Sequence, residues 1–204
     1  LNGLLKPTAG EILVDNKNIW ENPKEIRKIR SKVGLVFQYP EYQLFEETVF
    51  KDVAFGPSNM GLSGDELNTR VLDTCRLVGI RDEYLEKSPF DLSGGEKRRV
   101  AIAGVMAMRP EIIVFDEPTA GLDPKGREDV MKIIFDYRLA TSATVIVISH
   151  SMEDMAVLAD KLLVMNKGSL FMFDTTENVF KNGDKLREIG PVSYTHLTLP
   201  TSDL

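Results

Sequence analysis

Residues 112–117 read Ile-Ile-Val-Phe-Asp-Glu, and this stretch decides the fold. Its apolar run is continuous rather than alternating, which is typical of a strand buried on both faces of a sheet. Two adjacent carboxylates, Asp116 and Glu117, follow directly, and Pro118 comes next. Carboxylates at the end of a buried strand can hold a magnesium ion and activate a water molecule. The stretch therefore predicts a central strand with a hydrolytic site at its end.

A second motif lies upstream of that strand and reads Leu92-Ser93-Gly94-Gly95-Glu96. Ser93 and Glu96 have the spacing of a capping box, which predicts a helix over residues 94–108. A serine and two glycines at a helix start also form a turn whose backbone N–H groups can bind an anion. An ordinary capped helix would explain this motif on its own. Together with the acidic strand end, it indicates nucleoside triphosphate chemistry.

The composition bounds the class of protein. The 204 residues are 43% hydrophobic and 27% charged, which is enough for an apolar core. The net charge of −6 argues against binding to a nucleic-acid backbone, because such binding needs a concentrated basic face. Cys75 is the single cysteine, so an internal disulfide cannot form. We therefore expect the protein to work in a reducing compartment. No apolar run reaches the roughly 20 residues that span a bilayer, so at a membrane another chain would supply the spans.

The apolar periodicity alternates between strands and helices along the chain. It predicts strands at residues 11–14, 33–38, 112–115, 144–148, 161–165 and 169–174. It predicts helices at residues 24–30, 64–78, 94–108, 124–138 and 152–159, with Asp123 and Ser151 capping the last two. Residues 1–5 are predicted to end a helix, and residues 39–61 read as irregular. Such alternation predicts a mainly parallel α/β sheet.

The two ends of the sequence suggest a gene fragment. The first five residues begin in the middle of an element. From Val192 the sequence loses the period and charge of the preceding residues, and resembles the in-frame translation of a transposon-type sequencing adapter. We therefore expect residues 192–204 to be a non-native tail, with an ordinary C-terminal extension as the alternative.

Three further features complete an ordered set of motifs. Gln38 ends a predicted strand, Ala120-Gly121-Leu122-Asp123 follows the acidic pair, and His150 follows the apolar run 144–148. In this order the motifs resemble those of the nucleotide-binding subunit of an ATP-binding cassette (ABC) transporter, over residues 1–189. The resemblance implies an α/β fold: a P-loop NTPase-like ABC ATPase sheet with a helical subdomain at about residues 39–108.

The resemblance also implies a role for each residue. Asp116 would orient Mg²⁺ through water, and Glu117 would polarise the water that attacks ATP. His150 would contact the γ-phosphate and hold that water in line. Gln38 would sense Mg²⁺ and the water and couple them to the transporter. Asp123 belongs to the D-loop, which links two sites across a dimer, although Asp123-Pro124 is also a good helix start in any protein.

The signature motif implies a dimer. In this family Ser93, Gly94, Gly95 and Glu96 reach the γ-phosphate of an ATP molecule held by the partner subunit, so two chains complete each site. The implied partner is a paralogous ABC ATPase subunit. The implied ligands are ATP and Mg²⁺, and no nucleic acid is expected.

Residues 38–49, 53–57 and 99–104 resemble those of an energy-coupling factor (ECF) transporter ATPase, and residues 46–48 and 152–154 favour the second of its two paralogues. Such complexes import vitamins or metal ions through a substrate-binding membrane protein that the ATPase would contact only indirectly. The resemblance implies a peripheral position at the cytoplasmic face of the cell membrane.

An apolar groove is predicted where a transmembrane coupling protein would dock, near residues 42–50. Its lining is predicted to be Tyr42, Leu44, Phe45, Val49 and Phe50. The alternative is that these residues only pack the helical subdomain.

A phosphate-binding loop of the form Gly-x-x-x-x-Gly-Lys-Ser/Thr does not occur in the 204 residues. Residues 2–11 resemble the segment that comes after the Walker A helix in the family. We therefore expect the N-terminal strands and the Walker A loop to be missing, and the chain as written to bind ATP weakly or not at all.

Two other classes remain as alternatives. A DNA-repair-type ABC ATPase would share the signature, the acidic strand end and the D-loop. Those proteins carry long coiled-coil insertions, for which Gln38 and Ser93 are too close in sequence. A degenerate, non-catalytic interaction subunit would lack the phosphate loop, but it would have no evident need for Glu117 and His150.

Overall fold

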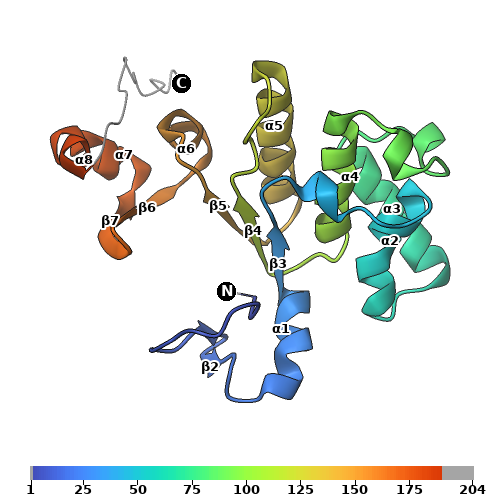
Figure 1. Ribbon diagram of the computed structural model, residues 1–204, viewed down its shortest axis with the longest axis horizontal. Helices are drawn as coiled ribbons and strands as arrows, with labels where there is room; N and C mark the ends of the chain where they lie inside the picture. Colours follow the sequence, from blue (N-terminus) through green and yellow to red (C-terminus); the bar gives the residue numbers. More distant parts are fainter. Residues whose placement is uncertain (1, 190–204) are drawn as a thin grey trace. The chain divides into compact units, whose positions relative to one another are not determined.

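The computed structural model describes residues 2–189, and the chain divides into two compact units, residues 1–148 and 149–204. The first unit is built on a three-stranded parallel sheet in the order β3-β4-β5, with β4 in the middle (Figure 1). The strands are β3 (Val33–Val36), β4 (Ile112–Asp116) and β5 (Thr144–Ile148). The parallel α/β sheet predicted from the sequence is therefore confirmed.

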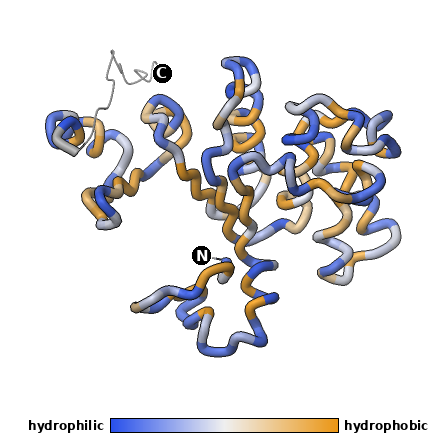
Figure 2. Tube along the Cα trace, viewed as in Figure 1, coloured by the Kyte–Doolittle hydropathy of each residue, from blue (hydrophilic) through white to orange (hydrophobic). Residues whose placement is uncertain are grey.

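The central strand carries the core of the first unit. Ile113 and Phe115 of β4 are both fully buried, and Val33 and Val36 of β3 are 1% exposed. Figure 2 shows these strands as the most continuous apolar segment of the trace. A run without polar alternation can stay buried only if both faces of the strand are covered, and β4 meets that condition.

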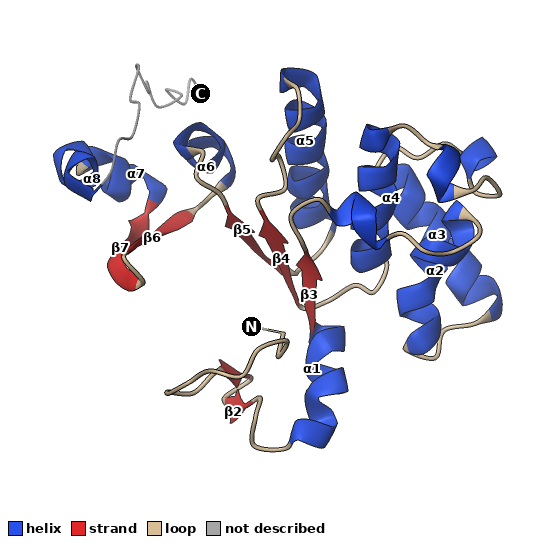
Figure 3. Cartoon of the chain, viewed as in Figure 1, coloured by secondary structure: helices blue, strands red, loops and turns tan. Residues whose placement is uncertain are grey.

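Helices α2, α3, α4 and α5 accompany this sheet (Figure 3), and α2, α3 and α4 gather beyond its β3 edge. Thr48 accepts a hydrogen bond from the backbone N–H of Lys51 and caps α2, and Asp123 accepts one from Gly126 at 2.8 Å and caps α5. The helices are α2 (Val49–Asn59), α3 (Gly64–Leu77), α4 (Gly94–Met106) and α5 (Pro124–Ala140). Short 3₁₀ turns lie at η2 (Pro40–Gln43), η3 (Asp82–Tyr84) and η4 (Pro89–Asp91).

Helix α2 corrects the prediction that residues 39–61 are irregular. Gly56 and Pro57 resemble helix breakers in sequence, and Pro57 does lie inside α2, where a proline removes one N–H donor from the helix. Val49 and Val53 are fully buried on one face. The capped start and this apolar face outweigh the local breakers.

The start of the chain forms a small hairpin rather than the end of a helix. Residues 3–5 make bends, with Gly3 at a φ of 72°. Asp15 and Asn16 both have positive φ, which matches the tight two-residue turn of a hairpin. The elements are β1 (Leu13–Val14), β2 (Lys17–Asn18), η1 (Pro23–Glu25) and α1 (Ile26–Lys32).

Within residues 149–189, the described part of the second unit, the chain forms an antiparallel hairpin and three short helices. Its strands pair from Lys161 with Thr175 to Asn166 with Ser169, as the sequence predicted. Helices α7 and α8 were not predicted. The elements are α6 (Met152–Leu158), β6 (Lys161–Asn166), β7 (Ser169–Thr175), α7 (Thr176–Lys181) and α8 (Gly183–Ile189).

The predicted non-native tail, residues 192–204, lies outside the described residues. None of the helices in residues 2–189 has both the length and the apolar character that crossing a bilayer requires. The limits of the ABC domain at residue 189 and of a helical subdomain at residues 39–108 stay predictions.

Candidate functional site

The acidic pair lies where strand β4 ends. Asp116 is the last residue of the strand and is half-buried, and Glu117 follows it with a φ of 47°. The backbone N–H of Glu117 donates to the carbonyl of Ile148 at 2.9 Å, and its own carbonyl accepts from Ala120 at 3.1 Å. A left-handed φ is uncommon for a residue other than glycine, and such strain concentrates at functional positions. The turn therefore holds Glu117 in a defined and unusual conformation.

Gln38 lies at the same edge of the sheet as the acidic pair. Strands β3 and β4 are parallel with Val36 opposite Phe115, so Gln38 and Glu117 each lie two residues beyond these matched positions. Gln38 is exposed. Ligands of open α/β sheets bind at the carboxyl ends of the strands. The structure thus brings Gln38, Asp116 and Glu117 to the edge where such a ligand would lie.

The predicted capping box is present at the start of α4. The Ser93 hydroxyl accepts from the backbone N–H of Glu96 at 3.4 Å, and the Glu96 carboxylate accepts from the backbone N–H of Ser93 at 2.9 Å. The same carboxylate accepts from the Ser93 hydroxyl at 2.7 Å, and these bonds lower the pKa of Glu96. Gly94 and Gly95 are exposed, with no atom within 4 Å of where a Cβ would lie. The signature turn therefore presents open backbone at a helix N-terminus.

The structure supports the predicted roles of Asp123 and His150 less directly. The Asp123 carboxylate caps α5, so the helix-start interpretation is confirmed and the D-loop role stays a prediction. His150 is exposed in a bend before α6 and belongs to the second unit. Its contact with the γ-phosphate also stays a prediction.

A magnesium ion would find only a sparse protein donor set here. Within residues 2–189 no group of three or more His, Cys, Asp or Glu side chains could hold a metal. Mg²⁺ in nucleotide sites commonly takes one or two carboxylates and fills its shell with water and phosphate oxygens. The half-buried Asp116 and the exposed Gln38 at one sheet edge fit that chemistry.

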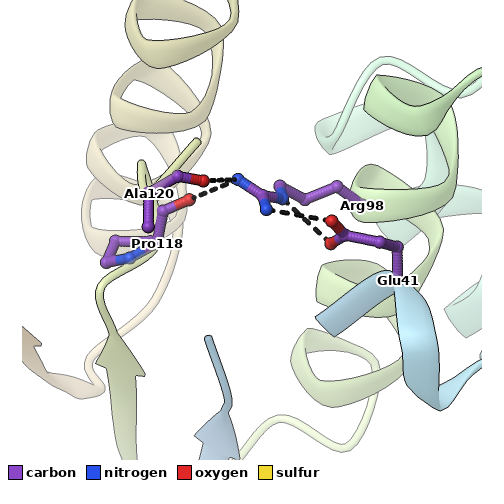
Figure 4. A network of polar contacts seen from close by, with 4 residues as sticks. All are labelled: Glu41, Arg98, Pro118 and Ala120. Carbon is purple, nitrogen blue, oxygen red and sulfur yellow. Dashed lines mark hydrogen bonds and ion pairs between the residues drawn. The ribbon is translucent and has the colours of Figure 1, made fainter. Parts of the chain in front are cut away.

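Sequence reasoning missed Arg98, which is 3% exposed on α4. Its guanidinium contacts the loop that follows Gln38 and the loop that follows Glu117, as Figure 4 shows. One feature of the sequence could have indicated this role of Arg98. Arg98 lies four residues before Ile102 and eight before Met106, so it shares the apolar stripe of its helix. A charge on such a stripe needs a buried partner.

The parallel sheet, the capped signature turn and the acidic strand end are those of an ATP-binding cassette protein. The family model described as ABC transporter matches residues 1–120, and the chain belongs to this family.

Two curated relatives that share one name are similar to this chain over most of its length. The chain is 53% identical over 190 residues to the energy-coupling factor transporter ATP-binding protein EcfA2 of Caldanaerobacter subterraneus subsp. tengcongensis, covering 93% of this chain and 66% of that protein. It is 54% identical over 191 residues to the protein of the same name from Clostridium perfringens, covering 93% and 67%. The chain thus spans about two thirds of the length of these relatives.

Solved structures show the same fold. The structure of cbiO1 from Clostridium perfringens, part of the ABC transporter complex cbiONQ, matches with a TM-score of 0.80 and 39% identity, over 92% of this chain and 74% of that one. The ATP-binding cassette MJ0796, solved as a dimer in a post-hydrolysis state with ADP and phosphate, matches with a TM-score of 0.73 and 29% identity, over 86% and 77%.

Proposed function

We propose that this protein is the ATP-hydrolysing subunit of an ECF-type import complex, coupling ATP hydrolysis to uptake of a vitamin or metal ion. The observation that carries the proposal is the Asp116–Glu117 pair, held at the end of β4 beside the segment of Gln38. The relatives named as energy-coupling factor transporter ATP-binding proteins support the subtype.

In the proposed reaction Glu117 accepts a hydrogen bond from the attacking water and polarises it. Asp116 and Gln38 would hold Mg²⁺, and the ion would neutralise charge on the phosphate oxygens. For His150, which lies in the second unit, the role toward the γ-phosphate rests on the family resemblance alone. Each of these groups acts through position, because phosphoryl transfer leaves the protein little covalent chemistry to perform.

The experiment that tests the function uses a full-length version of the chain that includes a phosphate-binding loop, co-purified with its ATPase and membrane partners. ATP hydrolysis and substrate uptake in vesicles should both depend on this subunit. If hydrolysis persists unchanged when Asp116 is replaced by Asn, a non-catalytic interaction subunit becomes the better assignment. The 204-residue chain alone should show no tight ATP binding, because it contains no phosphate loop.

The partner in the proposed dimer is a paralogous ATPase whose bound ATP meets the signature turn. The exposure of Ser93, Gly94 and Gly95 supports this, since open N–H groups at the start of a 13-residue helix attract phosphate.

Ser93→Arg is expected to block hydrolysis at the site completed by this turn, lowering its turnover by about 100-fold or more, as loss of one transition-state donor does. The arginine adds bulk where a phosphate would lie. Phosphate release measured with the partner's own signature disabled isolates that site. Ser63→Arg is the matched control, because it puts the same side chain at the exposed start of α3, outside the signature turn, and it should retain most activity. Equal loss in both variants would contradict the signature role.

The proposed docking surface for the transmembrane protein consists of Tyr42, Phe45 and Phe55. These side chains lie in exposed positions, at 85%, 58% and 46%, and the Phe45 and Phe55 rings pack edge to face with centroids 4.8 Å apart. Leu44 and Val49 are buried instead, at 7% and fully, so they pack the interior and do not line a groove. Of the predicted lining, Tyr42 and Phe45 stay in the proposed surface, and Phe50 is half-buried. Phe55 was not predicted and is added because its ring packs on that of Phe45.

Tyr42→Ala is expected to weaken binding to the transmembrane partner by about 2 kcal/mol, the loss typical of an exposed aromatic anchor. Affinity measured with the partner in nanodiscs checks this. The melting temperature of the subunit should not change, because the ring is 85% exposed. Phe90→Ala, at an exposed ring on η4 outside the surface, is the control and should keep full affinity. Comparable losses in the two variants would argue against this docking surface.

A further inference from the structure

A buried arginine joins two loops that leave the edge of the sheet. The Arg98 side chain is 4% exposed, and its Nε and one terminal nitrogen donate to the two carboxylate oxygens of Glu41, each at 3.0 Å. The other terminal nitrogen donates to the carbonyls of Ala120 at 3.0 Å and Pro118 at 3.3 Å (Figure 4). One planar group therefore binds a side chain on one loop and the backbone of another.

The two loops are those that carry the candidate catalytic groups. Glu41 lies on η2, after Gln38 and directly before Tyr42 of the docking surface. Pro118 and Ala120 belong to the turn that fixes Glu117, since the backbone N–H of Ala120 donates to the Glu117 carbonyl. Arg98 is thus hydrogen-bonded both to the residue next to Tyr42 of the docking surface and to the turn that holds Glu117.

Tyr39 provides a second contact between the same loops. A Cβ at Gly121, where φ is 72°, would lie 3.3 Å from Cε1 of the Tyr39 ring. The Arg98 guanidinium carbon lies 5.7 Å from the centre of that ring. The loop after β3 therefore packs on the loop after β4 as well as being bonded to it through Arg98.

The chemistry of this position favours arginine over lysine. The guanidinium offers a rigid fork that pairs with both oxygens of Glu41 and still has donors for two carbonyls. A lysine ammonium has three donors and no fixed plane, so it cannot replace this set. Burial of the pair also means that removing either partner leaves an uncompensated charge.

We propose that Arg98 is a positioning residue that couples the docking surface to Glu117 by locking the loop after β3 to the loop after β4. A displacement of Tyr42 moves Glu41, and Arg98 transmits this to Pro118 and Ala120. This inference rests on the proposed function, because Glu117 matters only if the protein hydrolyses ATP. Coupling differs from mere proximity only if a change in one loop is shown to alter the other loop.

The test compares Arg98→Lys, Glu41→Gln and their double variant in the full-length complex. Each single change should lower the partner-stimulated kcat about tenfold, within the range of energetic coupling between sites, and change the KM for ATP less than twofold. The double variant should be no worse than either single one, because both remove the same link. Arg76→Lys is the matched control, since Arg76 forms an exposed ion pair with Asp82 at 3.0 Å.

A charge swap separates coupling from simple stability. Glu41→Arg combined with Arg98→Glu can re-form the ion pair, but glutamate has no donor for the carbonyls of Pro118 and Ala120. The swap should melt at a higher temperature than Arg98→Glu alone, because one ion pair is regained, but at a lower temperature than the unmodified protein, and its kcat should stay low. Recovery of kcat in the swap would overturn the inference, as would a kcat for Arg98→Lys no lower than that of Arg76→Lys.

Amide hydrogen exchange provides a readout that does not depend on activity. Glu41→Gln should speed exchange at the Ala120 amide about tenfold, although residue 41 has no bond to Ala120 itself. Unchanged exchange at Ala120 would overturn the inference even in an active complex. A wild-type complex without ATPase activity would instead refute the proposed function, and the exchange result would still decide whether the loops are coupled.

Discussion

Glu117→Gln in a full-length version of the subunit should abolish ATP turnover, lowering kcat by at least about 100-fold, because general-base catalysis contributes that much or more. Glutamine keeps the size of the side chain and one acceptor oxygen, but it carries no negative charge and cannot polarise the attacking water. The backbone bonds of residue 117 to Ile148 and Ala120 do not involve the side chain and should persist. ATP binding should therefore survive, and the dimer should accumulate in its closed, ATP-bound state.

Single-turnover hydrolysis and size-exclusion chromatography with radiolabelled ATP would measure both effects. Glu111→Gln is the matched control, because Glu111 lies just before β4, at the opposite end of the strand from Glu117. It forms an exposed ion pair with Lys32 at 3.1 Å and should leave kcat near that of the unmodified protein. Unchanged hydrolysis by the Glu117→Gln protein would refute the role assigned to Glu117.

Local sequence signals were enough to predict the elements that frame the site. The start of α4 depends on two side chains three residues apart, and β4 depends on a continuous apolar run. Both are short-range features, so the sequence contains them directly. The parallel sheet followed from the alternation of strands and helices.

The predictions that failed needed information from distant residues. Residues 2–5 have the composition of a helix end, but Gly3 packs so closely on Ile26 that an added Cβ would lie 2.2 Å from its Cδ1. The partners of Arg98 lie at positions 41, 118 and 120, and no local pattern links them. The roles of Asp123 and His150 did not fail but stay predictions, because they depend on a second chain or on bound nucleotide.

The second prediction with a large expected effect concerns the core of the first unit. Phe115→Ala is expected to lower the free energy of unfolding of the 204-residue chain by about 3–5 kcal/mol. Phe115 is fully buried on the central strand, with Val36 opposite on β3 and Val147 opposite on β5. Truncating the ring removes apolar burial and leaves a cavity that a two-sided sheet cannot fill by collapse. Since domains are stable by only about 5–15 kcal/mol, this loss should be a large share of the total.

Phe135→Ala is the matched control, because it removes the same ring from a position on α5 that is 42% exposed. Urea unfolding followed by circular dichroism should show a clearly lower midpoint for Phe115→Ala and a change of less than about 1 kcal/mol for Phe135→Ala. Phe115 also directly precedes Asp116, so the destabilised strand should release the acidic pair as it unfolds. Equal shifts in the two variants would mean that β4 is not the core of this unit, and would remove the rigid support on which Asp116 and Glu117 depend.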